Sequence, residues 1–175
     1  MLIKYKGILL RLVDDVDASF IVSLRNDKKK SKFISKSSPD IDAQKLWISE
    51  YKTRERQKKE FYFIATDENG EDFATYRIYK IDSGLPEIGS WVSKPNYLKA
   101  KNSIKVDIAI KNYILNELNF DNIQFEVRKE NLSVNNYHKL FHPNLINTDE
   151  NNNYYILKKQ SFNAVIQDIL NKFKI

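Results

Sequence analysis

The chain has 175 residues, a length typical of one domain, and its 42% hydrophobic content is enough for a sizeable core. It has no cysteine and two histidines, which excludes disulfides, thiol nucleophiles and zinc–thiolate sites, so we expect no metal. The net charge of +6 suits a polyanionic partner. We find no apolar run of about 18 residues and no signal-peptide cleavage site, so we expect a cytoplasmic protein.

The first half of the chain predicts a strand, two helices and a hairpin. Residues 3–13 are mostly apolar and β-prone, and residues 14–27 follow as a short amphipathic helix. Residues 37–59 predict a helix with a serine cap and Pro39 at its first position. Its expected buried stripe is Ile41, Leu46 with Trp47, and Tyr51. Residues 60–81 form two β-rich runs joined by "DENG", a hairpin signal.

The second half alternates strands and helices. Residues 86–94 predict a strand closed by Pro95, and the helix that follows has about four turns. Its apolar positions are Ile104, Ile108, Tyr113 or Ala109, Leu115 and Leu118. Then come a strand at 122–127, a short helix at 133–141, strands at 145–148 and 153–159, and a C-terminal helix at 161–175. The order β-α-α-β-β-β-α-β-α-β-β-α favours a single α/β domain over residues 1–175 with a mixed sheet.

The densest basic cluster is "NDKKKSKFISKSS", residues 26–38. It has one aromatic residue and no accompanying helix-turn-helix, zinc or RNA-binding signature, so a solvated loop is the favoured interpretation. Nucleic-acid binding through residues 28–36 is the alternative, and it predicts an affinity that falls steeply with salt. We expect nucleic acid not to be the partner.

Two strings, in this order and spacing, resemble a known family. "ILLRLVDDVDASFIVSLRND" (8–27) is similar to the opening of the ribosomal-protein and amino-sugar acetyltransferases, and "EVRKENLSVNNYHKLF" (126–141) resembles their strand, Asn-bearing turn and helix. These belong to the GNAT superfamily of acyl-CoA-dependent N-acetyltransferases. The resemblance implies a mostly antiparallel sheet of about seven strands flanked by helices, with residues 161–175 as a C-terminal helical extension. It implies acetyl-CoA as co-substrate.

The resemblance also implies where acetyl-CoA binds. In the family, a splayed strand pairs with the pantetheine arm, and a glycine-bearing loop before the long helix turns its amides toward the pyrophosphate. Here Leu98 replaces the Gln or Arg of that loop and Lys101 its first glycine, so the loop has no glycine. A solvent-facing helix start with incidental lysines is the alternative. The candidate cofactor-binding residues are Trp91, Val92, Ser93, Lys99, Ala100, Lys101, Asn102, Ser103, Ile104 and Asn131.

The candidate catalytic residues follow from positions in the same motifs. Glu87 occupies the place of the family's general base, although an exposed loop acid is an equal interpretation. The acid that protonates the thiolate is usually a Tyr seven residues after the Asn, and counting from Asn131 gives His138, with Tyr137 just before it. A histidine can donate a proton near neutral pH, and either residue remains a candidate.

The acceptor is expected between the first two helices and the strands near residues 73–81 and 88–93. Its candidate contacts are Arg25, Asn26, Phe33, Tyr76 and Arg77, where an arginine can grip a phosphate or carboxylate and aromatic rings can stack. The resemblance favours direct acetyl transfer to the amine of a nucleotide-linked amino sugar in surface polysaccharide synthesis, or to a protein N-terminus. A catalytically degenerate module that binds acyl-CoA or serves assembly is the alternative. Both a monomer and a homodimer remain open.

Overall fold

The computed structural model describes all residues, 1–175, and its centre is one eight-stranded sheet. The strand order is β1-β2-β3-β4-β5-β6-β8-β7, and every neighbouring pair is antiparallel except β5 and β6, which are parallel. The strands are β1 Leu2–Tyr5, β2 Ile8–Leu12, β3 Phe61–Thr66, β4 Asp72–Tyr79, β5 Glu87–Ser93, β6 Asn122–Arg128, β7 Asn144–Thr148 and β8 Asn152–Lys158. The expected mixed, mostly antiparallel sheet is confirmed, with one more strand than expected.

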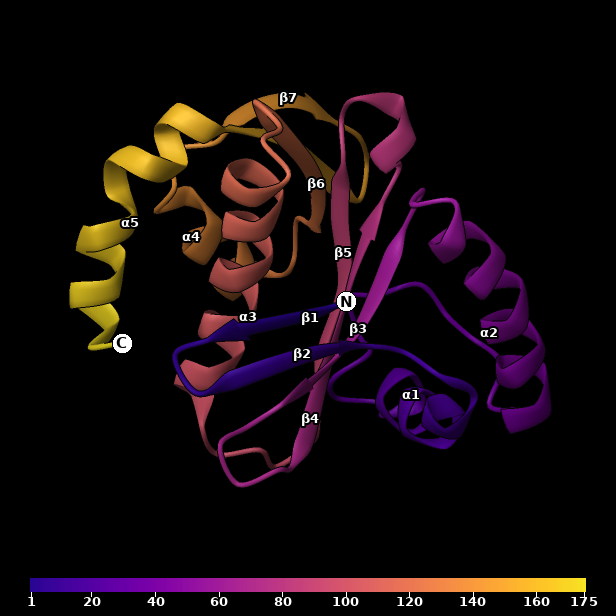
Figure 1. Cartoon of the computed structure of the whole chain (residues 1–175). Coiled ribbons are helices and arrows are strands. Elements are labelled where there is room, and N and C mark those ends of the chain that lie inside the picture. The colour runs from indigo at the N-terminus through magenta and orange to yellow at the C-terminus, as the bar shows by residue number, and fades with distance from the viewer.

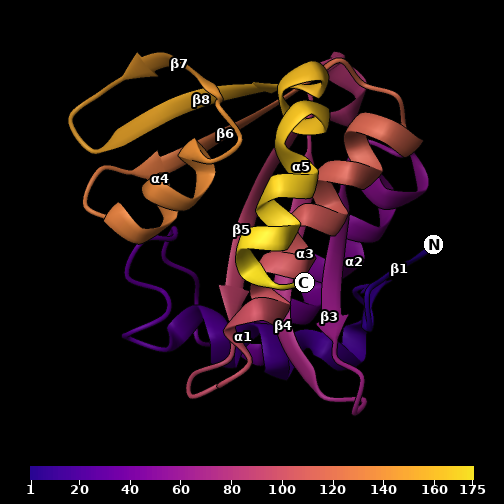
Figure 2. The same ribbon diagram turned by 90° about the vertical axis from the view of Figure 1, so that its left-hand side faces the viewer.

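Helices cover both faces of this sheet (Figure 1). One face carries α1 and α2, and the other carries α3, α4 and α5, as the turned view also shows (Figure 2). The helices are α1 Ala18–Asn26, α2 Ile41–Arg56, α3 Ala100–Asn112, α4 Leu132–Lys139 and α5 Lys159–Phe173, and α3 continues as a π-helical turn over Tyr113–Glu117. No helix combines the length and the apolar character that crossing a membrane requires.

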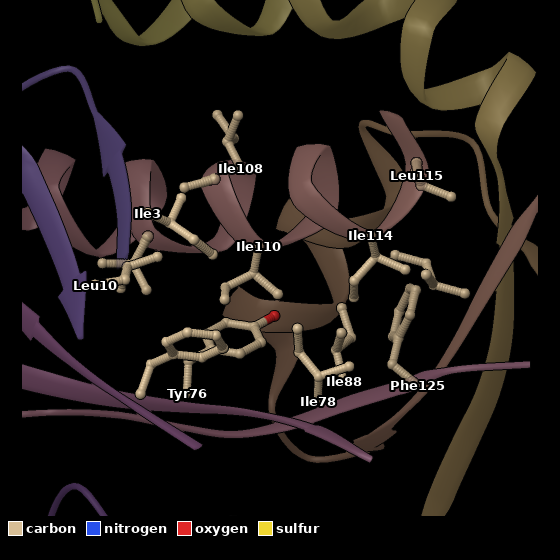
Figure 3. Close-up of a cluster of buried hydrophobic side chains, with 14 of the residues drawn as sticks. Ile3, Leu10, Tyr76, Ile78, Ile88, Ile108, Ile110, Ile114, Leu115 and Phe125 are labelled. Atoms are coloured by element: carbon tan, nitrogen blue, oxygen red, sulfur yellow. The ribbon is translucent and has the colours of Figure 1, made fainter. Parts of the chain in front are cut away.

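The larger hydrophobic core lies between the sheet and α3. Ile110 and Ile114 of this helix point toward side chains of the strands beneath, whereas Ile108, also buried, points away from those strands (Figure 3). A smaller cluster on the opposite face joins Ile21 of α1 and Tyr51 of α2 to Tyr62 of β3. The sheet is therefore buried on both sides through its middle, which fixes the registers of β3, β4 and β5.

The first predicted strand, residues 3–13, is in fact a hairpin of β1 and β2. Lys6 and Gly7 both have positive φ, 45° and 83°, and Tyr5 pairs with Ile8 across the turn. A two-residue turn with both φ values positive matches the twist of an antiparallel pair. The prediction of a single strand was wrong because apolar residues continue on both sides of the turn.

Helix α2 differs from the prediction at its start and in its buried face. Asp40 is the N-cap, with its carboxylate accepting from the amides of Asp42 and Ala43, so Pro39 lies before the helix. The prediction that Ile41 and Leu46 are buried was wrong, because both are exposed. Ile48 and Tyr51 form the buried stripe, and the Tyr51 hydroxyl accepts from the buried Tyr62 amide at 2.8 Å.

Helix α5 packs on the core rather than standing free of it. Phe162, Ile169 and Leu170 are buried in the larger cluster. The ring of Phe162 stacks on Phe141 at 5.8 Å between centroids, and Phe173 lies 6.2 Å from Tyr137. The C-terminal helix thus lies over α3, with α4 beside it, as Figure 2 shows.

Candidate active site

Strands β5 and β6 meet at one end and diverge. Their only paired residues are Glu87 and Gln124, next to a backbone bond from the Gln124 amide to the Pro86 carbonyl at 2.9 Å. Beyond this pair, Ile88 to Ser93 have no strand partner on the β6 side. Backbone donors and acceptors on such an edge can pair with an extended ligand. The opening between β5 and β6 therefore fits a pantetheine-like arm, as expected for the splayed strand.

A β-bulge in β5 lies at the middle of this opening. Thr75 pairs with Val92 and Arg77 with Gly89, so Ser90 and Trp91 together stand opposite Tyr76. Ser90 has φ of 51°, and its side-chain oxygen lies 2.6 Å from the hydroxyl of Tyr79. A bulge of this kind frees backbone groups from the ladder and redirects side chains.

The bulge sends neighbouring side chains to opposite faces of the sheet. Gly89 and Ser90 both contact Tyr79 on the α1–α2 face, where a Cβ on Gly89 would lie 3.0 Å from the Tyr79 ring. Trp91 turns to the other face, with its ring within 6.0 Å of Tyr76, Tyr137 and His138 by centroid. The α1–α2 face of the opening therefore presents the hydroxyls of Ser90 and Tyr79, and the other face presents the Trp91 ring among aromatic side chains.

Glu87 lies on the α1–α2 face, at the closed end of the opening. It lines a pocket of about 200 Å³ together with Phe33, Ser90 and Glu126. Its Oε2 accepts from Lys80 at 2.6 Å and from Gln124 at 3.3 Å, and Oε1 has no protein partner. This half-buried carboxylate, two residues before the bulge, thus keeps one oxygen free to accept a proton or hydrogen bond from a ligand in the pocket.

The first turn of α3 begins just after the open end of β5. Its N-cap, Lys99, makes no side-chain capping bond, and Ala100 and Ser103 are small, so the turn is accessible to an anion. The amides of Ala100 and Asn102 already bond to the carbonyls of Leu98 and Lys99. The turn can hold phosphate oxygens with its remaining amides, and the residues present fit a pyrophosphate here.

The two lysines of this loop have partners of their own. Lys99 Nζ lies 2.8 Å from the buried carboxylate of Asp67 and 3.2 Å from Glu68. The hydrogen bond from Lys99 holds the pKa of Asp67 well below its usual range. Lys101 Nζ bonds to the backbone carbonyl of Lys174 at 3.2 Å. The charge of Lys99 is therefore balanced by acids, whereas that of Lys101 is not.

Of the other predicted cofactor residues, two make hydrogen bonds that support the protein's own backbone and side chains. The Asn102 side chain is buried and donates to the Tyr97 hydroxyl at 2.7 Å, which supports the loop rather than facing outward. Asn131 caps α4 by accepting from the Val134 amide at 3.3 Å. The remaining ones are Val92, which is buried, Ser93, which accepts from Lys30 at 3.3 Å, and Ile104, which is half-buried at the core edge.

On the α3–α4 face lies a buried polar network around Asp107. The carboxylate of Asp107 accepts from Tyr76 at 2.5 Å, from Tyr137 at 2.6 Å and from Lys111 at 2.5 Å. Asp107 and Lys111 have no exposed surface. Burial alone would raise the pKa of Asp107, but the charge of Lys111 and the donated hydrogen bonds lower it, so Asp107 is ionised.

His138 joins this network through Lys111. Its Nδ1 lies 3.1 Å from Lys111 Nζ, and its ring lies between Trp91 of β5 and Phe125 of β6, at 6.0 and 4.5 Å between centroids. Burial, then the neighbouring ammonium, lowers the pKa of His138 to about 3. His138 is thus a neutral imidazole between the two diverging strands. The structure brings His138 and Tyr137 together, across the opening from Glu87.

A cationic cavity of about 360 Å³ lies between α1, α2 and β4. Three cations line it, Arg25, Lys36 and Arg77, and none of its lining residues is acidic. Its other lining residues are Ile21, Ser35, Ser37, Ser38, Ala43, Gln44, Trp47 and Tyr62. Ser35 also lines the pocket that contains Glu87, so the two spaces adjoin.

Four of the predicted acceptor residues are near these two spaces, and one is not. Arg25 bonds to the Ser35 carbonyl and hydroxyl at 2.9 Å, and Asn26 bonds to the Ser38 carbonyl at 3.4 Å, so both fasten the basic loop to α1. Phe33 lines the pocket of Glu87. Tyr76 differs from the expectation, because it is buried on the face opposite Arg77. Adjacent strand residues point to opposite faces, so the two cannot line one cavity.

Arg77 itself combines a salt bridge with aromatic contacts. It pairs with Glu60 at 2.8 Å, and its guanidinium lies 4.7 Å from the Trp47 ring and 4.3 Å from the Tyr79 ring. Its Nε and the Ser37 hydroxyl are buried without a hydrogen-bond partner. Buried donors of this kind cost free energy unless a ligand satisfies them. The cavity is therefore suited to an anionic group.

The sequence reasoning missed Asp107 and Lys111. An acid and a base four residues apart on a helix usually form an exposed pair. These two, however, follow Ile104 by three and seven residues, which places them on the apolar stripe that continues to Leu115. This overlap of the charged pair with the buried face was the available signal.

Comparisons with known proteins identify chains with the same fold. The chain is similar to apo FdhC, described as a nucleotide-linked sugar GNAT, with 32% identity, 97% of each chain covered and a TM-score of 0.84. It shares its fold with a spermidine N-acetyltransferase SpeG mutant from Vibrio cholerae (14% identity, 89% of this chain and 96% of that one, TM-score 0.73). It also shares its fold with ribosomal-protein-S5-alanine acetyltransferase from Vibrio fischeri (12% identity, 93% of this chain and 98% of that one, TM-score 0.74). No protein-family model and no curated protein sequence matches the chain.

The similarity to FdhC extends over nearly the whole of both chains, and the mixed, mostly antiparallel sheet flanked by helices agrees with the expected fold class. The chain therefore belongs to the GNAT superfamily of acetyl-CoA-dependent N-acetyltransferases.

Proposed function

We propose that the protein transfers an acetyl group from acetyl-CoA directly to the primary amine of a nucleotide-linked amino sugar. The observation that carries this proposal is the cationic cavity next to the pocket of Glu87, which Arg25, Lys36 and Arg77 line without an acid. Glu60 balances the charge of Arg77 from outside the lining, so Arg25 and Lys36 supply the net positive charge. A nucleoside diphosphate supplies the negative charge that such a cavity stabilises. The similarity to a nucleotide-linked sugar GNAT supports the same acceptor class.

In this proposal the acyl donor lies in the opening between β5 and β6. The free edge of β5 pairs with the pantetheine arm, Trp91 to Ser93 contribute its contacts, and the first turn of α3 receives the pyrophosphate. Lys101 adds a positive charge there, while Lys99 supports the loop through Asp67. Asn131 holds the start of α4, which carries Tyr137 and His138.

The chemistry uses both faces of the opening. Glu87 accepts the proton of the amine, directly or through a water, on the α1–α2 face. Backbone N–H groups that the bulge at Ser90 frees from the ladder stabilise the oxyanion. On the α3–α4 face His138 protonates the departing thiolate. Tyr137 is the second candidate for this proton, but its hydroxyl already donates to Asp107 at 2.6 Å.

The acceptor class is tested by comparing three amines with acetyl-CoA as donor: a nucleotide-linked amino sugar, the same sugar without the nucleotide, and a peptide with a free N-terminus. We expect transfer to the first, with a KM at least tenfold below that of the free sugar. We also expect Arg25→Ala to raise the KM for the nucleotide-linked sugar roughly tenfold or more, since it removes a charged contact. Lys28→Ala, in the loop that follows α1 and outside the cavity lining, should have little effect. Faster transfer to the peptide would replace this acceptor by a protein N-terminus.

A second candidate function rests on the α3 loop. Because Lys99 is neutralised by Asp67 and Glu68 and the loop has no glycine, the fold also suits a degenerate module that binds acyl-CoA or serves assembly without turnover. Saturable binding of acetyl-CoA without transfer to any amine of a broad panel would support this module.

The cytoplasm is the proposed location. A monomer and a homodimer both remain compatible with the proposal.

A further inference from the structure

We propose that Lys111, held by Asp107, fixes His138 in one tautomer and passes a proton through it to the thiolate that leaves the acyl donor. This inference rests on the proposed acetyl transfer. It makes Lys111 and Asp107 positioning residues that act through His138, deep in the core, where neither touches the acceptor.

The tautomer of His138 follows from its contact with Lys111. An ammonium has three donors and no acceptor, so at 3.1 Å the Nδ1 of His138 must accept. The proton of the neutral ring is therefore on Nε2, and Nε2 makes no hydrogen bond within the protein. Since the ring lies between Trp91 of β5 and Phe125 of β6, Nε2–H is a donor between the two diverging strands.

The groups around His138 keep the imidazole neutral. The titratable groups that face it are Lys111 and Asp107 of α3, with Tyr137 of α4 and Tyr76 of β4 joined to them through Asp107. The strands β5 and β6 face it with aromatic rings. An imidazolium 3.1 Å from a buried ammonium would be strongly disfavoured.

A neutral imidazole alone is a poor acid, because loss of Nε2–H would leave an imidazolate. Lys111 removes this obstacle when two transfers are coupled. The S–H bond forms as Nε2–H breaks, and the Nδ1–H bond forms as one Nζ–H of Lys111 breaks. The products are a thiol, a neutral imidazole with its proton on Nδ1, and a neutral amine on Lys111. The positive charge of Lys111 and the negative charge of the thiolate cancel, so the step is balanced.

The environment of Lys111 favours this transfer. Burial lowers the pKa of its ammonium below the usual value, although Asp107 opposes this, and a lower pKa makes loss of a proton easier. After the transfer Asp107 keeps two donors, the hydroxyls of Tyr76 and Tyr137 at 2.5 and 2.6 Å, so its charge stays hydrogen-bonded. Once the thiol leaves, Nδ1 returns its proton to Lys111 and Nε2 takes a proton from solvent, which receives in turn the proton that Glu87 took from the amine.

Nuclear magnetic resonance of the wild-type protein, with 15N-labelled histidine and lysine, tests the tautomer of His138 and its contact with Lys111 before any reaction. The chain has two histidines, so the exposed His142 supplies the single reference signal. We expect His138 to stay neutral between about pH 5 and 8, with its proton on Nε2, and the Lys111 ammonium to exchange slowly and contact the His138 ring. A proton on Nδ1, or an imidazolium in that range, would overturn the proposal.

Kinetics of Asp107→Asn with Lys111→Met test the transfer itself. This double substitution removes both charges and keeps an oxygen that accepts from Tyr76 and Tyr137. We expect kcat to fall at least tenfold, with the KM for acetyl-CoA within about twofold of wild type, and Lys105→Met on the same helix to keep the wild-type kcat. A lower kcat with an unchanged KM for acetyl-CoA would not follow from a general loss of structure, which would weaken binding as well.

The two experiments separate this inference from the proposed function. A double variant with wild-type kcat would overturn the proton transfer while leaving acetyl transfer by the wild type established. Absence of transfer by the wild type would instead overturn the proposed function. If the double variant does not fold, the wild-type spectra still decide the tautomer on which the inference depends.

Discussion

At the scale of single residues, the two proposed catalytic groups differ in how the protein holds them. Glu87 is half-buried, lines a pocket and has one oxygen tied to Lys80 and Gln124. His138 is buried, neutral and fixed through Nδ1. In the proposed reaction, Glu87 takes a proton from the amine on one face of the opening, and His138 gives a proton to the thiolate on the other face.

Glu87→Gln is expected to lower kcat roughly 100-fold, because an amide cannot accept the proton of the amine, while the shape of the pocket is kept. The matched control is Glu126→Gln, which lines the same pocket from β6 and is exposed. Steady-state rates of acetyl transfer measure both. Equal losses in the two variants would show that the pocket needs negative charge in general rather than a base at residue 87.

At the scale of elements, the loop between β5 and α3 depends on an anchor from the β3–β4 hairpin. The buried carboxylate of Asp67 accepts from Lys99 at 2.8 Å, from Tyr97 at 3.0 Å and from the amides of Asn69 and Glu71. Burial raises the pKa of Tyr97 to about 12, so its hydroxyl remains a donor. One side chain thus joins the hairpin turn to the segment that starts α3.

Asp67→Asn is expected to lower the urea midpoint at pH 7, because it removes the charge that Lys99 stabilises. The pKa of Asp67 is depressed in the folded state, so its contribution is complete above the unfolded value of about 3.9 and is lost as the pH falls further. The difference between wild type and variant should therefore persist to about pH 4 and shrink below it. Urea unfolding at pH 7, 4 and 3 measures this, and a difference that grows on acidification would contradict the assignment.

Most elements could be predicted from the sequence because their patterns are local. The helical period of residues 104–118 and the "DENG" turn predicted α3 and the β3–β4 hairpin. The β1–β2 turn was missed because Lys-Gly is a weak turn signal between apolar runs. Motif spacing located Glu87, Tyr137 and His138, whose roles remain predictions. It could not locate the partners of His138, because Asp107 and Lys111 meet it only through packing of α3 on α4.

At the scale of the whole molecule, two hydrophobic clusters on opposite faces of the sheet separate the two halves of the site. The larger one includes α5, whose Phe162 and Phe173 pack on Phe141 and Tyr137, the rings that adjoin Lys111 and Asp107. The smaller one holds α1 and α2 beside the cationic cavity. The C-terminal helix is therefore part of the support of His138, although it contributes no group to the proposed reaction.

Phe162→Ala is expected to lower the free energy of unfolding by about 3–5 kcal/mol. The Phe162 ring is 1% exposed and stacks on Phe141, so truncation leaves a cavity that the helices cannot easily close. Denaturant unfolding measures the change, and Gln167→Ala on the exposed side of α5 serves as the control. A loss below about 1 kcal/mol, less than the usual range for a buried ring, would mean that α5 is not held on the core.

The central claim of this account is that the opening between β5 and β6, with a glycine-free loop, binds the acyl donor. Calorimetric titration of the wild-type protein with acetyl-CoA tests it most directly, with dephospho-CoA and Lys101→Ala as comparisons. We predict a dissociation constant of about micromolar order, corresponding to roughly 8 kcal/mol. We also predict weaker binding to Lys101→Ala, because this lysine has no acidic partner. The absence of binding at millimolar acetyl-CoA would contradict the account.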